Sequence, residues 1–449
     1  MRNQINVLCH FLLLWVVSSC THTPVSEGRV KTNLAVPYEA IGVLSPKSIH
    51  EVKNDLTLGC EVLDRDYADY HQYKEYIVPL GLKKIRLQAG WAKTEKIKGV
   101  YDFAWLDSII NDAVGRGIKI WLQASYGNPI YEGGGTPYLK GGWPTSEEGK
   151  TAWNRWVEAM ALHYKGKVYE WEIWNEPDIN KEQIKDYKSL TDLNIRTAEI
   201  IKRIEPDAKI AALALAFAED VYPKVEKMRQ VIQKYSDHIK LWQGENGAPS
   251  KGYMGGALGA YQWSEVSQAK WALRRMLGDH GRDIATGIFS IADMNYGGND
   301  AIKKKNVKGL LETNEQNQVV RAKVVYYAVQ HLASVFDLLQ HSVDVHRFEV
   351  KTDYPYSLFA YQDEKSELQS FLIWYDEATP TNFNQPTPVD VEVAGGKFKN
   401  PVWVDLLTGK VYKIPAGDIS KHGDKYCFSN LPVYDSPIMV VDQSLIKYE

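Results

Sequence analysis

The stretch that decides the fold is residues 168–177, which read VYEWEIWNEP. Val168–Trp174 has the length and the largely apolar character of a buried strand. Asn175 and Glu176 place an amide and a carboxyl where the strand becomes a loop, and Pro177 stops the strand. A carboxyl held against tryptophan is desolvated, which raises its pKa and suits it to donate a proton near neutral pH.

Outward from this stretch, strand-like runs alternate with amphipathic helix-like stretches from about residue 56 to 340. Such alternation predicts a parallel sheet, and a repeat of about 30 to 50 residues fits a (β/α)8-type TIM barrel. The expected strands are Leu56–Leu63, Lys84–Ala89, Ile118–Ala124, Val168–Trp174, Ile210–Leu215, Ile239–Gln243 and Ile284–Ile291. The expected long helices are Thr151–Tyr164, Glu182–Ile204, Val221–Tyr235, Glu265–Gly278 and Val319–Leu339.

This set holds seven strands, whereas a complete barrel of this type has eight. If Ile239–Gln243 is the seventh strand, strand six is missing, because Ala216–His238 has room for one helix only. Three explanations stay open: Glu245 follows a sixth strand, the barrel is seven-stranded or gapped, or a segment has been lost. A closed barrel needs strand number and shear to agree, so a missing strand could misplace Glu245.

From residue 341 to 449 the pattern changes to short β-type runs, which turns rich in Asn, Pro and Gly separate. This pattern predicts a β-sandwich packed on the barrel domain of residues 56–340. Residues 21–55 read as a tether and an irregular lead-in.

The first 20 residues have the pattern of a signal peptide. Val7–Val17 is apolar but too short to span a bilayer as a helix. Val17–Cys20 resembles a bacterial lipoprotein box, in which the Cys20 thiol is acylated; the alternative is an ordinary signal peptide cut near the small residues. We therefore expect an exported protein, lipid-anchored at the bacterial cell envelope, in the periplasm or at the cell surface.

The 449 residues carry a net charge of −3, from 53 basic and 56 acidic side chains. No excess of one sign favours nucleic acid or an anionic membrane, so membrane contact is expected only through the lipid anchor. Of the four cysteines, Cys9 is expected to be removed with the signal peptide and Cys20 to be acylated, so Cys60 and Cys427 remain. The sequence has no pair of Cys or His residues at the spacing typical of a metal site. The sequence leaves the oligomeric state open.

A second carboxyl, Glu245, follows the run Ile239–Gln243 and lies between two glycines that allow a tight backbone. In a barrel, chemistry is carried at the carboxyl ends of the strands, where Glu176 and Glu245 are both expected. Two carboxyls that face one sugar are the minimal set for hydrolysis of a glycosidic bond. Either glutamate by itself would more often be solvated or salt-bridged than catalytic.

The run Trp174–Pro177 matches the Asn-Glu-Pro signature of the clan of retaining glycoside hydrolases with (β/α)8 barrels. Arg86, in the second expected strand, matches the arginine that supports the nucleophile in that clan. The barrel-plus-sandwich layout most resembles glycoside hydrolase family 39, whose activities include β-xylosidase and α-L-iduronidase. The His-x-Tyr segment that this family carries at the end of strand six is not found here.

The resemblance implies that Glu176 is the acid/base, Glu245 the nucleophile, Asn175 the ligand of the sugar 2-hydroxyl, and Arg86 the residue that keeps Glu245 ionised. Further side chains at the expected strand ends are candidates for substrate binding and equally for structural roles: Trp91, Tyr126, Asn128 and Tyr296.

The sequence therefore predicts a retaining glycoside hydrolase for oligosaccharides or polysaccharides, which needs no cofactor or metal because carboxyls carry both roles. The alternative is a carbohydrate-binding protein on a degenerate, inactive barrel. The sugar, the anomer and the choice between endo and exo action depend on loops such as Tyr131–Pro144.

Overall fold

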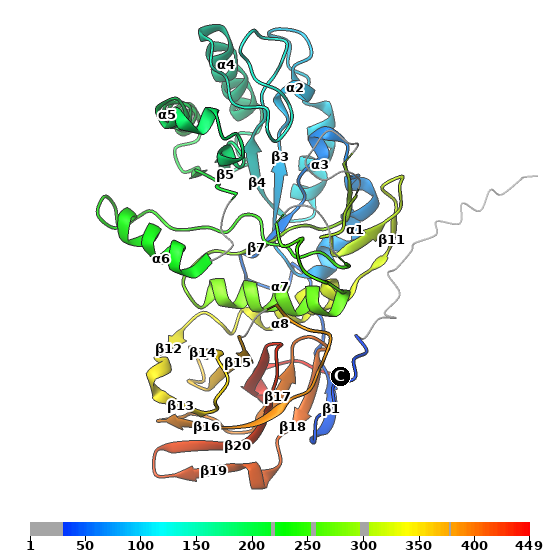
Figure 1. The fold of residues 1–449 in the computed structure, drawn as a ribbon, viewed down its shortest axis with the longest axis vertical. Coiled ribbons are helices and arrows are strands. Elements are labelled where there is room, and N and C mark those ends of the chain that lie inside the picture. Colours follow the sequence, from blue (N-terminus) through cyan, green and yellow to red (C-terminus); the bar gives the residue numbers. More distant parts are fainter. Residues whose placement is uncertain (1–29, 217–220, 253–256, 297–304, 377–378) are drawn as a thin grey trace, which may run out of the picture.

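The computed structural model describes residues 30–216, 221–252, 257–296, 305–376 and 379–449. A barrel-like α/β domain and a β-sandwich are stacked along the long axis of the molecule, with α7 and α8 between them (Figure 1). The expected signal segment and Cys20 lie outside the described residues. None of the described helices is long and apolar enough to cross a bilayer.

The barrel domain is built on a parallel sheet with strand order β6-β5-β4-β3-β2-β7. Helices follow most strands, as the alternating pattern predicts. The strands are β2 (Thr57–Gly59), β3 (Lys84–Gln88), β4 (Lys119–Ala124), β5 (Glu170–Ile173), β6 (Lys209–Ala212) and β7 (Gly287–Ile288). The helices are α1 (Tyr70–Leu80), α2 (Trp91–Thr94), α3 (Ala104–Gly115), α4 (Glu147–His163), α5 (Tyr187–Ile204), α6 (Val221–Ile232), α7 (Glu265–His280) and α8 (Val324–Phe336).

Four of the helices, α1, α4, α5 and α7, begin where a polar side chain accepts from a free backbone N–H group. Ser146 accepts from the Gly149 N–H at the start of α4, and Ser264 forms a reciprocal capping box with Ser267 at the start of α7. Helix α8 is apolar on nearly every side and largely buried, because it lies between the barrel and the sandwich (Figure 1).

The sheet does not close into a full barrel. A seventh segment runs beside β7: Trp242 forms a parallel bridge with Ala285, and the Gln243 N–H donates to the Ala285 carbonyl at 2.8 Å. Within the described ranges, no strand pairs with the outer edge of β6, and all four residues of β6 are at least partly exposed, whereas β5 is fully buried. The gap lies at the sixth position, so the segment before Glu245 occupies the seventh.

The expected helix Val319–Leu339 is wrong at its start. Leu311–Thr313 (β10) and Val319–Ala322 (β11) form an antiparallel hairpin, and α8 begins only at Val324. Asn317 takes a positive φ of 59° in the turn of this hairpin, a conformation that asparagine tolerates, and the chain then continues as β11 where the helix was expected to begin. A second short pair, β8 (Met294–Asn295) and β9 (Lys305–Asn306), follows β7.

The sandwich consists of two antiparallel sheets with strand orders β1-β18-β17-β21-β15-β14-β12 and β13-β16-β20-β19. Its core is aromatic and β-branched, with Phe371, Trp403 and Phe428 fully buried. The strands are β1 (Glu39–Val43), β12 (Ser342–Val343), β13 (Phe348–Lys351), β14 (Tyr356–Gln362), β15 (Gln369–Tyr375), β16 (Thr387–Ala394), β17 (Pro401–Asp405), β18 (Lys410–Lys413), β19 (Ile419–His422), β20 (Lys425–Val433) and β21 (Ile438–Asp442).

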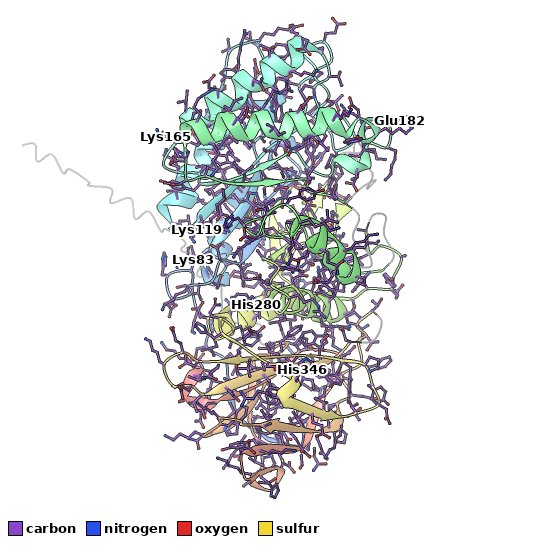
Figure 2. The ribbon with its side chains drawn as sticks, turned by 90° about the vertical axis from the view of Figure 1, so that its left-hand side faces the viewer. Lys83, Lys119, Lys165, Glu182, His280 and His346 are labelled. Carbon is purple, nitrogen blue, oxygen red and sulfur yellow. The ribbon has the colours of Figure 1, made fainter. Side chains whose placement is uncertain are left out.

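Residues 39–43, within the range expected as an irregular lead-in, are the edge strand β1 of the larger sheet. Figure 2 labels His280, at the end of α7, near the junction of the two domains. The His280 ring stacks on Tyr361 of β14, with 5.7 Å between ring centroids. Lys83 and Lys119 lie side by side at the amino-terminal ends of β3 and β4 (Figure 2).

Candidate active site

Arg86 of β3 lies at the centre of the site, with 1% of its side chain exposed. Its Nε and Nη2 donate to the two oxygens of Glu172 at 2.7 and 2.9 Å. Nη1 donates to Glu61 Oε1 and to Glu245 Oε1, both at 2.6 Å, and Nη2 also donates to Asn175 Oδ1 at 2.9 Å. A guanidinium has five N–H donors, so every donor of Arg86 is used.

Three carboxyls therefore surround one buried cation. Burial opposes the charge on Arg86, but the neighbouring carboxyl groups, Glu172 first and then Glu245 and Glu61, outweigh burial and raise the pKa of Arg86. Arg86 stays charged at every physiological pH and holds the three carboxyls in fixed positions.

Glu245 follows the segment that pairs beside β7, and about a quarter of its side chain is exposed. Gln243 Nε2 donates to the Glu245 carbonyl at 2.6 Å and fixes the backbone there. An added Cβ at Gly247 would lie 1.9 Å from the Phe289 carbonyl oxygen, so this close approach to the β7 segment requires glycine. The Glu245 carboxyl is thus held against Arg86 on one side and open on the other.

Glu176 lies three residues beyond the end of β5 in a strained backbone conformation, with φ +45° and ψ +54°. Its N–H donates to the Ala214 carbonyl at 2.8 Å, which fixes the bend. Burial and then the charge of Glu245 raise the pKa of Glu176 to about 8, while Arg86 and Lys308 oppose the rise. A carboxyl with its pKa raised in this way is suited to donate a proton near neutral pH, and it lies beside Glu245, which accepts a hydrogen bond from Arg86.

Lys308 faces both glutamates from the loop between β9 and β10. Burial lowers the pKa of Lys308 to about 8, and the charges of Glu245 and Glu176 oppose this shift. The Lys308 N–H donates to Asn306 Oδ1 at 3.0 Å, and Gln268 Nε2 donates to the Lys308 carbonyl at 3.2 Å. The loop thus places a second cation near the acid and the carboxylate.

Asn175 is held on both sides of its amide. Its Oδ1 accepts from Arg86 and from Gln123 Nε2 at 3.1 Å, and its Nδ2 donates to the Tyr126 hydroxyl at 2.8 Å. The Tyr126 hydroxyl also accepts from Gln88 Nε2 at 3.3 Å. An amide nitrogen has two N–H groups, so one N–H of Asn175 has no acceptor among the residues that the structure describes.

The structure thus brings together five predicted residues: Arg86, Tyr126, Asn175, Glu176 and Glu245. The other three predicted residues make structural contacts within the protein. Trp91 is fully buried in α2, donates to Glu95 Oε2 at 2.5 Å and stacks on Trp156, so its ring packs in the core and offers no exposed face to a sugar.

Asn128 and Tyr296 also have structural partners. Asn128 is fully buried, and its Nδ2 donates to the Glu95 carbonyl at 2.8 Å. Tyr296 packs against Tyr67, with 4.9 Å between ring centroids, and its hydroxyl accepts from Asn306. These contacts hold the loops around the site.

Sequence reasoning missed four residues of the cluster: Glu61, Glu172, Gln123 and Lys308. Every second side chain of a strand faces the barrel interior, and Glu172 of β5 and Gln123 of β4 are at such positions, where they contact Arg86 and Asn175. Strand periodicity could therefore have found them. Lys308 comes from a loop and carries no periodic signal. Among the described residues, no group of His, Cys, Asp and Glu side chains is arranged to hold a metal ion.

Comparison with known proteins places the fold. No family model matches the sequence, and no curated protein matches it. Among solved structures, the chain is similar to a family 39 glycoside hydrolase from Bacteroides cellulosilyticus WH2, with 17% identity, a TM-score of 0.57, and coverage of 89% of this chain and 83% of that one. It is also similar to a monomeric β-xylosidase from Caulobacter crescentus CB15, with 14% identity, a TM-score of 0.50, and coverage of 90% and 98%.

The fold is therefore a TIM-barrel-type α/β domain with a carboxyl-terminal β-sandwich, and solved structures with this layout include glycoside hydrolases. More narrowly, it is the fold of glycoside hydrolase family 39, as the Asn-Glu-Pro run and the layout predict.

Proposed function

We propose that this protein is a retaining glycoside hydrolase with Glu176 as acid/base and Glu245 as nucleophile. One observation carries the proposal: Arg86 Nη1 donates to Glu245 Oε1 at 2.6 Å, and burial, with Glu245 close by, raises the pKa of Glu176 to about 8. Two carboxyls kept in opposite protonation states are what acid-assisted displacement at a sugar carbon requires.

In the first step, Glu176 gives its proton to the glycosidic oxygen and Glu245 attacks the anomeric carbon. The bond to the leaving oxygen breaks, the leaving sugar departs as an alcohol, and an ester forms between the sugar and Glu245. In the second step, Glu176 takes a proton from water, whose oxygen attacks the anomeric carbon and releases Glu245. The product keeps the anomeric configuration of the substrate.

The substrate is an oligosaccharide or polysaccharide fragment. Asn175 offers its remaining N–H to the 2-hydroxyl of the sugar next to the cleaved bond, and Tyr126 orients that amide from the other side. Lys308 supplies a further donor toward the same sugar. These contacts strengthen as charge develops at the anomeric carbon, which is where they assist the reaction.

A direct test follows the anomer of the first product by NMR during hydrolysis of an aryl glycoside, with Glu245→Gln as the matched variant. We expect retention in the wild type and loss of turnover in a Glu245→Gln protein that melts cooperatively. Full activity of Glu245→Gln, or a product of inverted configuration, contradicts the assignment.

A second candidate is a carbohydrate-binding protein on an inactive barrel. The outer edge of β6, which is partly exposed and pairs with no strand within the described ranges, favours it, because closed barrels hold the seventh strand in register through the sixth. This candidate predicts sugar binding by calorimetry with no hydrolysis of any aryl glycoside that binds.

We further propose that the protein is exported and anchored by a lipid on Cys20, since a small-residue pair directly precedes this cysteine. Mass spectrometry of the mature amino terminus tests the anchor. An acylated cysteine at the first position is expected, and an unlipidated terminus contradicts it.

A further inference from the structure

Glu61 is a third carboxyl on Arg86, and the hydrolysis mechanism above gives it no role. It follows β2 by two residues, and only 1% of its side chain is exposed. Its Oε1 accepts from Arg86 Nη1 at 2.6 Å, the same nitrogen that donates to Glu245 at the same distance. Glu61 and Glu245 therefore share the two N–H groups of one nitrogen.

The surroundings of the second oxygen of Glu61, Oε2, indicate that this carboxyl is neutral. Oε2 is buried and has no hydrogen-bond partner among the described residues. A buried carboxylate oxygen without a partner is costly, whereas a protonated one carries no charge to solvate. Burial, together with the charge of Glu245 and against Arg86, raises the pKa of Glu61 to about 8.

The charges in the cluster agree with that state. Arg86 already pairs in a bidentate manner with Glu172 and holds Glu245, so an ionised Glu61 would place a third negative charge on one guanidinium. Among the described residues, the other titratable groups beside Glu61 are its chain neighbour Cys60 and, from α1, Tyr73. Both are buried, and burial raises the pKa of each well above its usual range, so neither carries a charge at neutral pH.

The backbone is built to accept the Glu61 carboxyl in this place. An ideal Cβ on Gly59 of β2 would lie 2.5 Å from Glu61 Oε2 and 3.1 Å from Oε1. The carboxyl thus occupies the space that a side chain at residue 59 would fill. The φ of Gly59 is not positive, so alanine fits the backbone and collides only with Glu61.

We propose that Glu61 is a positioning residue of the active site: as a neutral acid it takes one N–H of Arg86 Nη1 and so directs the other N–H at Glu245. This inference rests on the proposed role of Glu245 as nucleophile. A neutral partner orients the guanidinium without drawing its charge away from Glu245, which an ionised partner would do. The carboxyl acts through Arg86 and does not touch the substrate.

The first test measures protonation and needs no activity. The unfolded chain releases the Glu61 proton near the ordinary carboxyl pKa, but the folded chain keeps it to higher pH, so the wild type loses stability as pH rises between these values. Glu61→Gln has no proton to release. We expect the Tm of Glu61→Gln, relative to wild type, to rise steadily from about pH 5 to about pH 8. A difference that stays constant or falls over this range overturns the proposal.

The second test measures positioning through kcat/KM on an aryl glycoside. We expect Glu61→Ala to lose at least about tenfold, and Glu61→Gln to recover much of that loss because the amide oxygen still accepts from Arg86. Gly59→Ala should lower kcat/KM by displacing the carboxyl, and the double variant Gly59→Ala, Glu61→Ala should be no worse than Glu61→Ala.

Wild-type kcat/KM in Glu61→Ala, or additive losses in the double variant, overturn the positioning role. The two proposals fail separately. A wild type that hydrolyses no glycoside defeats the proposed function, and the melting series still decides whether Glu61 holds its proton.

Discussion

Substitution of Arg86 by lysine tests the centre of the site, because it keeps the charge and removes the planar fork. An ammonium has three donors, whereas Arg86 makes five hydrogen bonds, so at least two of its acceptors lose their partner. A hydrogen bond to a charged group contributes about 1.5–3 kcal/mol, so the loss is about 3–6 kcal/mol.

That free energy divides between folding and catalysis. Loss of the hydrogen bonds to the buried Glu172 and Glu61 lowers the stability of the fold, and loss of the hydrogen bond to Glu245 lowers the rate of reaction. If it falls wholly on the transition state, kcat/KM drops by about 10²–10⁴-fold. The assays are kcat/KM on an aryl glycoside and the urea midpoint of unfolding. The matched control is Arg116→Lys, whose ion pairs with Glu75 and Asp112 are partly exposed and should cost at most about 1 kcal/mol. An Arg86→Lys protein with wild-type urea midpoint and more than about a tenth of wild-type activity refutes the reasoning.

Three further predictions concern residues around this centre. Hydrolysis should fall as pH rises through about 8, where Glu176 loses its proton. Lys308→Met should move this alkaline limb of the pH–rate profile to higher pH, because the variant lacks a cation that favours the ionised form of Glu176. A limb that stays in place or moves to lower pH contradicts this prediction. Trp91→Phe should destabilise the fold by about 1–3 kcal/mol in urea unfolding, since buried Glu95 loses a donor, and a loss of substrate affinity without any loss of stability would instead place Trp91 at the sugar. Gly247→Ala should lower kcat/KM, because the added methyl group collides with the Phe289 carbonyl and pushes the Glu245 carboxyl away from Arg86. Wild-type kinetics in that variant would show that the segment around Gly247 is free to shift.

The sequence predicted the parts of the site that local pattern determines. Asn175 and Glu176 lie two and three residues beyond an apolar strand, at the carboxyl end of the sheet, and Arg86 lies within the neighbouring predicted strand, so the strand pattern alone brought these residues to the same part of the barrel. The count of strands also indicated the gap between β6 and the segment before Glu245, because chain length limits what can be built there.

The rest depends on contacts between residues that are distant in the sequence. Glu61 lies in the expected strand Leu56–Leu63, but β2 ends at Gly59, and the carboxyl turns toward an arginine 25 residues away. Trp91 also follows a strand, yet it begins a short helix and packs into an aromatic core with Trp153 and Trp156. Position along a strand gives the level of a side chain in the barrel, and tertiary packing decides whether it meets the substrate.

The most direct test of the central claim is the intact mass of the protein after incubation with a panel of activated 2-fluoro glycosides, which trap the covalent intermediate of a retaining enzyme. The account predicts a stoichiometric adduct, mapped by peptide sequencing to Glu245, and its absence in Glu245→Gln. An adduct on another carboxyl contradicts the assigned nucleophile. Hydrolysis of the parent glycoside without any adduct from its 2-fluoro analogue contradicts the covalent mechanism.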